Sequence, residues 1–207
     1  MRRIIAAGAC LPLIVCVVAS GTRVQASDHA KPAAGERSGV YAPYSFLIGE
    51  WDVRPEGGTQ PMAVTRFTWG RGGAYILMST SLFVRGREEP HFEGMLMWNG
   101  VHKHLDMLVA LDLRAGRTQE QGRMYKQEDG VVVREIAAYY SEGARTPDGA
   151  VVGARGASAR FRQTFKAVDP DHIRTSLVRK TPDGWHATFP GGDNALMTRR
   201  TPVADAH

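Results

Sequence analysis

The residues best suited to chemistry are His102, His104 and Asp106, which form a His-x-His-x-Asp sequence. In an extended strand alternate side chains project from the same face, roughly 7 Å apart. Imidazole and carboxylate groups are good ligands for divalent metals such as zinc and copper. The spacing therefore predicts a candidate metal site on one face of a strand.

A hairpin would enlarge this set. Asn99-Gly100 is a strong hairpin signal between the strand-like segments 91–98 and 103–113. A loop with an even number of residues would place His91, Glu93, Met95 and Met97 on the same face as the first three residues, whereas an odd loop would separate the two sets. The candidate ligands are His91, His102, His104 and Asp106, and the methionines would suit copper. Alternatively, this face is the solvated outside of a sheet, or it lines an interior cavity.

Other residues suggest a site for a small apolar or amphipathic molecule. The segment 74–83 is apolar on both faces, and aromatic and methionine side chains recur in the strands beside it. The candidate lining residues are Trp69, Tyr75, Leu77, Met78, Phe92, Met95, Met97 and Trp98. The sequence contains no Gly-x-Ser-x-Gly elbow, phosphate loop or dinucleotide fingerprint, so we assign no catalytic residue.

The elements that must position these residues are short strands. From residue 44 onward, apolar runs alternate with turn residues, which is typical of an all-β domain. We expect about ten strands, at 50–54, 62–69, 74–83, 91–98, 103–113, 117–127, 131–140, 158–168, 173–180 and 185–189, with a last strand at 194–200. A charged turn is expected at 85–90 and a long loop at 142–156.

Alternation is clearest in residues 103–113. Leu105, Met107 and Val109 share one face, and His104 and Asp106 share the other. Consecutive hairpins favour an antiparallel up-and-down order, and closing the sheet into a barrel removes its unpaired edges. A short helical turn is expected at 43–48, because the apolar residues there do not alternate.

The first 26 residues have the three parts of a secretory signal. Arg2 and Arg3 precede an apolar run, and Val24-Gln25-Ala26 is a cleavage-like site. We therefore expect a signal peptide at 1–26, a flexible leader at 27–43, a barrel at 44–201 and a tail at 202–207, in a periplasmic or secreted protein with no membrane span after cleavage.

Cleavage would change both the cysteine content and the charge. Both cysteines, Cys10 and Cys16, lie in the signal, so the mature chain would have no disulfide. Loss of three arginines would lower the net charge from +5 to +2, which gives no argument for nucleic-acid binding.

The segment 46–53, Phe-Leu-Ile-Gly-Glu-Trp-Asp-Val, resembles the opening of calycin barrels, which include lipocalins and nitrobindin-like proteins. The resemblance covers most of residues 44–200 and implies that Trp51 packs across one end of the barrel. It also implies that an arginine of the last strand, Arg199 or Arg200, lies over the indole. Haem-binding members of the nitrobindin group use a late histidine, and His186 would be the candidate here.

Three hypotheses follow for function. The first is an exported barrel that holds a small apolar or amphipathic ligand and has no cofactor. The second is a protein that binds copper, zinc or haem, or a metalloenzyme that uses the His/Met/Asp cluster. The third is an envelope interaction domain without a small ligand, which predicts an exposed apolar patch on the outside of the barrel.

Overall fold

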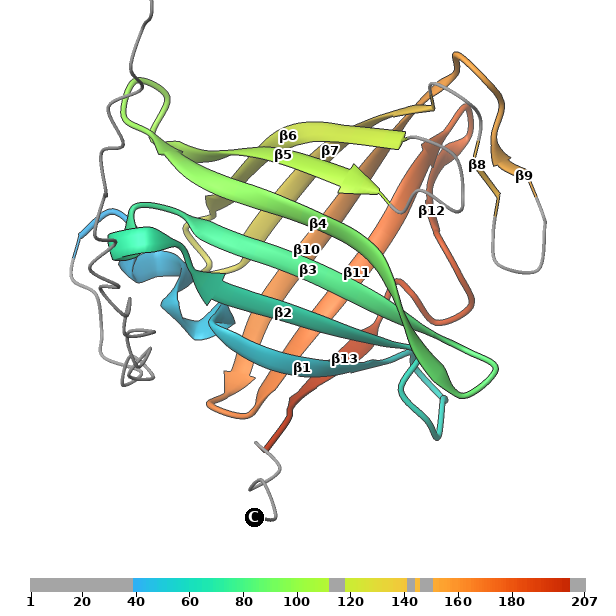
Figure 1. Cartoon of the computed structure of the whole chain (residues 1–207), viewed down its shortest axis with the longest axis horizontal. Helices are drawn as coiled ribbons and strands as arrows, with labels where there is room; N and C mark the ends of the chain where they lie inside the picture. Colours follow the sequence, from blue (N-terminus) through green and yellow to red (C-terminus); the bar gives the residue numbers. More distant parts are fainter. Residues whose placement is uncertain (1–38, 112–117, 141–143, 146–150, 202–207) are drawn as a thin grey trace, which may run out of the picture. The chain divides into compact units, whose positions relative to one another are not determined.

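The computed structural model describes residues 39–111, 118–140, 144–145 and 151–201, and it is almost entirely β-structure (Figure 1). The expected signal peptide, the expected tail and most of the expected leader lie outside the described residues. The first element is the 3-10 helix η1, Ala42–Leu47, where a helical turn was predicted. Pro43 lies at its start, where a fixed backbone angle and a missing N–H are tolerated.

Ten of the eleven strands of the main sheet build the barrel. Their bounds are β1 Gly49–Arg54, β2 Ala63–Trp69, β3 Ile76–Val84, β4 Arg87–Asn99, β5 His104–Leu111, β6 Thr118–Lys126, β7 Val132–Tyr140, β10 Ser158–Asp169, β11 His172–Thr181 and β13 Ala195–Arg199. The short strand β12, Gly184–Ala187, pairs only with β11. A separate two-stranded hairpin contains β8, Ala144–Arg145, and β9, Val151–Gly153, and a second 3-10 turn, η2, covers Arg71–Gly73.

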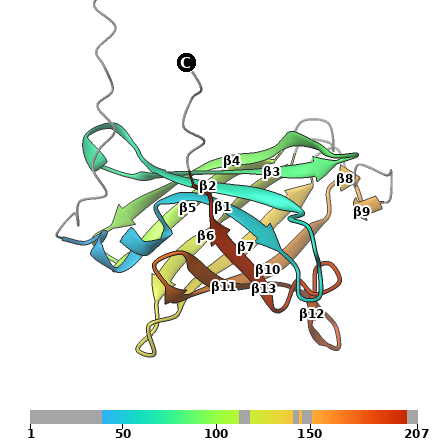
Figure 2. The same ribbon diagram turned by 90° about the horizontal axis from the view of Figure 1, so that it is seen from below.

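The ten strands close into an antiparallel barrel. Neighbours follow the order β10-β7-β6-β5-β4-β3-β2-β1-β13-β11, and a further pairing of β10 with β11 seals the sheet. Successive strands of the chain are therefore neighbours, and β13 inserts between β1 and β11 (Figures 1 and 2). The predicted fold class, an all-β antiparallel barrel of about ten strands, is confirmed.

The β4–β5 hairpin differs in detail from the sequence prediction. Asn99 pairs with His104, so the loop has four residues, and Lys103 rather than Gly100 takes the left-handed conformation, with φ of 52°. The Asn99 side-chain oxygen accepts hydrogen bonds from the backbone N–H groups of Val101 and His102. The turn thus depends on an asparagine cap instead of a two-residue Asn-Gly turn.

The expected charged turn at 85–90 is also shorter than predicted. Strand β4 begins at Arg87, and only Arg85 and Gly86 connect it to β3. Glu88 faces Phe83 in the ladder. Thr80 and Ser81 face Phe92 and Pro90, so His91 on β4 is the extra residue of a bulge. Charged residues belong to the strand here because its outer face contacts solvent.

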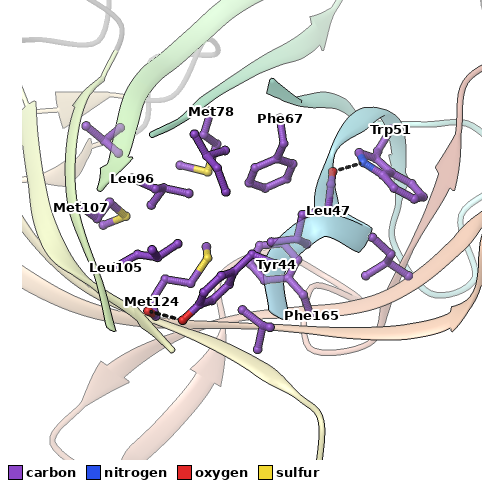
Figure 3. Close-up of a cluster of buried hydrophobic side chains, with 14 of the residues drawn as sticks. Tyr44, Leu47, Trp51, Phe67, Met78, Leu96, Leu105, Met107, Met124 and Phe165 are labelled. Atoms are coloured by element: carbon purple, nitrogen blue, oxygen red, sulfur yellow. Dashed lines mark hydrogen bonds between the residues drawn. The ribbon is translucent and has the colours of Figure 1, made fainter. Parts of the chain in front are cut away.

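Side-chain alternation separates the core from the outer wall. On β5, Leu105, Met107 and Val109 are buried, whereas Asp106 and Leu108 are exposed, as the period of two predicted. The buried set comes from nearly every strand of the barrel and from η1 (Figure 3). Its largest side chains include Trp51, Phe67, Phe165, Leu47 and Met124.

Candidate functional site

One end of the barrel is occupied by Trp51 and residues from η1. The indole N–H donates a hydrogen bond to the Leu47 carbonyl at 2.7 Å (Figure 3). Arg199 is directly across the ladder from Trp51, and its guanidinium carbon lies 4.1 Å from the indole centroid. Arg199 also donates to the carbonyls of Ile48 and Pro170. This contact ties the first strand to the last through a cation–π interaction.

A steric restriction explains why glycine occupies position 49 in the Gly-Glu-Trp sequence. Gly49 has a φ of +143°, and a Cβ there would collide with the Arg199 guanidinium. A larger residue at position 49 would therefore displace the arginine from the indole.

Arg200, the other arginine expected at this end, lies on the opposite face of the chain. Its guanidinium bonds Glu50 at 2.6 Å and Asp52 at 2.7 Å on the outer wall. Arg66 bridges the same Glu50 to Glu88. Successive residues of a strand point to opposite sides, so only Arg199 can contact Trp51.

His102, His104 and Asp106 do gather at the β4–β5 hairpin. The two imidazole rings stack with centroids 5.6 Å apart, and His104 Nε2 lies 2.9 Å from Asp106 Oδ1. Asn99 donates to the other carboxylate oxygen at 2.7 Å and lowers the pKa of Asp106 below its usual range, with the two histidines contributing. The cluster lies on the outer wall, because the alternate residues Leu105 and Met107 fill the core.

His91 does not join this cluster. The β4–β5 loop has an even number of residues, so the paired residues place Met97 opposite Asp106 on the same face, as the sequence predicted for an even loop. His91, however, is six residues before Met97 on the same strand, roughly 20 Å away at the usual rise per residue. Within the described ranges, no three His, Cys, Asp or Glu side chains are arranged to hold a metal ion. The four-residue set is thus not brought together.

His186, the haem candidate suggested by the resemblance, lies on the short strand β12. It is exposed, and its Nε2 is 3.2 Å from Asp183 at the neighbouring turn. This strand is outside the ten-strand barrel, because it pairs only with β11.

The eight predicted ligand-lining residues divide between the two sides of the wall. Met78 is buried in the core, and Trp69, Phe92 and Trp98 pack against that core while partly exposed. The other four, Tyr75, Leu77, Met95 and Met97, alternate with buried neighbours and face outward. Residues 74–83 are apolar on both faces, so composition does not distinguish the inner face from the outer one.

The outward residues form an apolar strip on β3, β4 and β5. Leu77 faces Met95, and Met95 faces Leu108. Met97 and Leu108 are 52% and 51% exposed. The strip places apolar side chains on the outside of the barrel.

The barrel interior contains a charged pair that the sequence prediction did not include. Arg134 on β7 is only 3% exposed, and its Nη2 lies 2.6 Å from Oε2 of Glu120 on β6. Nη1 donates to the Gln163 side-chain oxygen on β10 at 3.0 Å. Arg134, Glu120 and Gln163 thus place three polar side chains, from three neighbouring strands, inside the barrel.

The remaining neighbours of Arg134 come from strands β5, β4 and β3. Its Nε is 2.9 Å from the Met107 sulfur, its Nη1 is 3.6 Å from the Met78 sulfur, and its guanidinium carbon is 5.4 Å from the Phe92 ring centroid. Gly122 on β6 lies opposite Met107, and Met124, two residues on, lies opposite Arg134. The guanidinium therefore extends across β6 to meet a largely apolar surface.

Burial dominates the electrostatics of this pair. It raises the pKa of the Glu120 carboxyl, and the charge of Arg134 offsets part of that increase. The guanidinium itself stays protonated. Each guanidinium nitrogen has a partner, but two of these partners are thioether sulfurs, which are weak acceptors.

Two further polar atoms lie in the same interior. The hydroxyls of Thr118 on β6 and Thr175 on β11 are buried with no hydrogen-bond partner among the described residues. Thr65 and Thr80, by comparison, bond each other at 2.8 Å. Buried polar groups are usually paired, so these hydroxyls are further candidates for contact with a ligand or a water molecule.

Sequence signals for the interior site were present but ambiguous. Arg134 occupies the same strand phase as Val132, Ile136 and Ala138, where a charge is unexpected. Val133 on the other face is also apolar, so the phase did not show which side was inside. On β6, Met124 is the one large apolar residue in the same strand phase as Glu120, which is too little to identify the inner face.

No protein-family model and no curated protein matches the sequence. Among solved structures, one similar chain is described as "Crystal Structure of Rv2717c from M. tuberculosis". The two chains are 17% identical with a TM-score of 0.43, over 78% of this chain and 98% of that chain. Within the described part of this chain, no helix has the length and apolarity to cross a membrane.

Proposed function

We propose that this protein is an exported barrel that binds a small amphipathic molecule in its interior, with the polar group of the ligand against Arg134. The observation that carries the proposal is the buried Arg134–Glu120 pair. A buried ion pair is weak support for stability, because desolvation costs about as much as the attraction returns. A barrel that needed only a packed core would be served better by apolar residues at both positions.

The hydrogen bonding of Arg134 indicates the chemistry of the polar group. Its N–H groups face two thioether sulfurs, from Met107 and Met78, which a ligand oxygen would replace as a stronger acceptor. A carboxylate, phosphate or carbonyl oxygen would satisfy the fork of the guanidinium. Phe92 and the two methionines then supply apolar contacts for the rest of the molecule.

Export and membership of the calycin group are part of this proposal. The Arg-Arg start, apolar run and cleavage-like site of residues 1–26 support export. The Gly49–Trp51 sequence after a helical turn, with Arg199 stacked on the indole, is the arrangement that the resemblance to calycins implies. Both lines of support are independent of the interior pair.

Native mass spectrometry of protein purified from its host would test the ligand. We expect a bound small molecule in the natural protein and its loss in the double variant Glu120→Gln/Arg134→Met, which removes both charges together. Arg87→Met, an exposed arginine at the start of β4, is the matched control and should retain the molecule. An empty natural protein, together with a crystal structure whose interior is filled by side chains, would overturn the proposal.

A second candidate function is an interaction domain that uses the outer apolar strip of Leu77, Met95, Met97 and Leu108. The strip favours it because contiguous exposed apolar residues are a mark of interaction surfaces. Sedimentation velocity of the natural protein and of Leu108→Lys would test for self-association. Identical monomeric behaviour up to high concentration would exclude a homotypic role for this strip.

A further inference from the structure

The outer face of the β10–β11 hairpin is unusually cationic. Residues that alternate with the buried Ala159 and Phe165 on β10, and with Ile173 and Thr175 on β11, face outward. Within 158–166 and 174–180 these outward residues include no carboxylate. They include five cations: Arg160, Arg162, Lys166, Arg174 and Lys180. We call these five residues the cationic face.

The strand register places four of the five residues of the cationic face in two doublets and leaves Arg162 single. Arg160 faces Lys180 at one end, as the neighbouring pair Phe161 and Arg179 shows, and Lys166 faces Arg174 at the other. The doublets are six residues apart along β10, roughly 20 Å. Between them lie Arg162, which faces Val178, and the uncharged pair Thr164 and Ser176, which bond each other.

Most of these charges have no carboxylate partner within the described ranges. Among the described residues, Arg160, Lys166, Arg174 and Lys180 form no ion pair, while Arg162 lies 3.6 Å from Glu135, which also pairs with Arg123. By contrast Arg66 on β2 and Arg200 after β13 are matched by Glu50, Asp52 and Glu88. The positive charge of the hairpin face is therefore left for a partner.

Exposed apolar side chains border the cationic face. Trp185 on β12 lies beside Lys180, with Arg162 at 4.7 Å and Lys180 at 5.7 Å from its ring. Tyr139 on β7 is opposite Ser158, and Val168 is near the other end of β10. All three are among the exposed large hydrophobic residues of the described chain.

We propose that the cationic face docks the barrel on the surface of an anionic lipid bilayer. Lys and Arg near an anionic membrane are attracted to its surface potential, and Trp and Tyr favour the interfacial region. A soluble polyanion would use the charges but would gain little from Tyr139 and Val168 at the border. The combination of unpaired cations with exposed apolar neighbours favours the bilayer, and this proposal does not depend on ligand binding inside the barrel.

Vesicle co-sedimentation would test the docking. We expect the natural protein to bind vesicles of phosphatidylcholine with 30% phosphatidylglycerol at low salt, and not vesicles of phosphatidylcholine alone. Lys166→Gln/Arg174→Gln should lower the partition coefficient by about 30-fold, because each cation near the surface contributes roughly a fivefold factor. Arg87→Gln/Lys126→Gln removes the same charge from exposed positions on other strands and should retain most of the binding.

Trp185→Ala distinguishes a bilayer from a general polyanion, because it leaves the net charge unchanged. We expect it to weaken vesicle binding severalfold and to leave retention on a heparin column unchanged. Circular dichroism and melting temperature would verify that each variant is folded. Equal losses for the two double variants, or vesicle binding unaffected by Trp185→Ala, would overturn the proposal.

Discussion

Arg134 and Glu120 are the two side chains whose removal should separate structure from function most clearly. Arg134→Met alone leaves the Glu120 carboxyl buried without its cation, and such a loss typically costs about 3–5 kcal/mol of unfolding free energy. Glu120→Leu/Arg134→Met removes both charges and should be close to neutral in stability, since apolar replacements of buried pairs are tolerated. Urea denaturation of the natural protein and both variants measures this, and equal destabilisation by the single and double changes would contradict it.

The cost of Arg134→Met should depend on pH with a defined sign. Burial already raises the pKa of Glu120, and removing the neighbouring cation should raise it further. A raised native pKa contributes stability that is present below the ordinary glutamate range and is lost as pH rises through the native pKa. The stability deficit of the variant should therefore be larger at pH 7 than near pH 4.5. Unfolding curves of variant and natural protein at both pH values test this, and a constant deficit would exclude a charged Glu120 as its cause.

Arg199 and Arg200 form a natural matched pair of neighbouring arginines. Arg199→Ala removes the indole contact and hydrogen bonds to two carbonyls, so we expect a loss of about 2–4 kcal/mol. Arg200→Ala removes only surface ion pairs and should cost less than about 1 kcal/mol. Chemical denaturation gives both values, and a larger loss for Arg200→Ala would reverse this assignment.

At the scale of single elements, the β4–β5 turn has one position of evident strain. Lys103 has a φ of 52°, a conformation that glycine adopts without a steric cost. Lys103→Gly should therefore raise the unfolding free energy by up to about 1 kcal/mol. Gly100→Ala is the control, since Gly100 has no positive φ and only the Trp98 side chain is near its added methyl. A destabilised Lys103→Gly protein would indicate that the lysine side chain makes a compensating contact.

The same turn shows how far the sequence determines an element. The Asn99-Gly100 pair correctly located a hairpin, because those residue types favour turns, and the alternation in 103–113 correctly divided β5 into two faces. The turn type was not predictable from the dipeptide, because the side-chain cap from Asn99 supports a longer loop. Strands β3 and β4 are apolar on both faces, so their residue types do not show whether Leu77 and Met95 face inward or outward. The closure of the sheet decides this.

The interior site depends on contacts that no local pattern encodes. Arg134 bonds Met107, which is 27 residues away, and Met78, which is 56 residues away. Spacing along a strand shows which residues share a face, whereas these partners become neighbours only when the sheet curves round. The Arg134–Glu120 pair differs, because both residues lie within the single hairpin β6–β7. The sequence did not locate this pair because the phase of the two strands does not show which face is the inner one.

At the scale of the whole molecule, the barrel depends on its last strand to cover its first. β13 pairs with β1 on one side and β11 on the other, and Arg200 reaches Asp52 across 148 residues of sequence. Without β13, β1 would have an open edge and Trp51 would lose Arg199. The contact between Trp51 and Arg199 was expected from the family resemblance, because sequence spacing alone does not indicate which distant strands meet.

Truncation should therefore show that closure is cooperative. We expect a chain that ends at Asn194 to lose the sharp, two-state unfolding transition and to expose backbone amides throughout β1, because its partner on that side is gone. A chain that ends at Arg200 keeps β13 and should unfold like the full-length protein. Hydrogen exchange measured by mass spectrometry, with the Trp51 environment followed by near-ultraviolet circular dichroism, tests both. If the shorter chain keeps slow exchange in β1, some other segment must cover that edge, and β13 would be a dispensable strand of an open sheet.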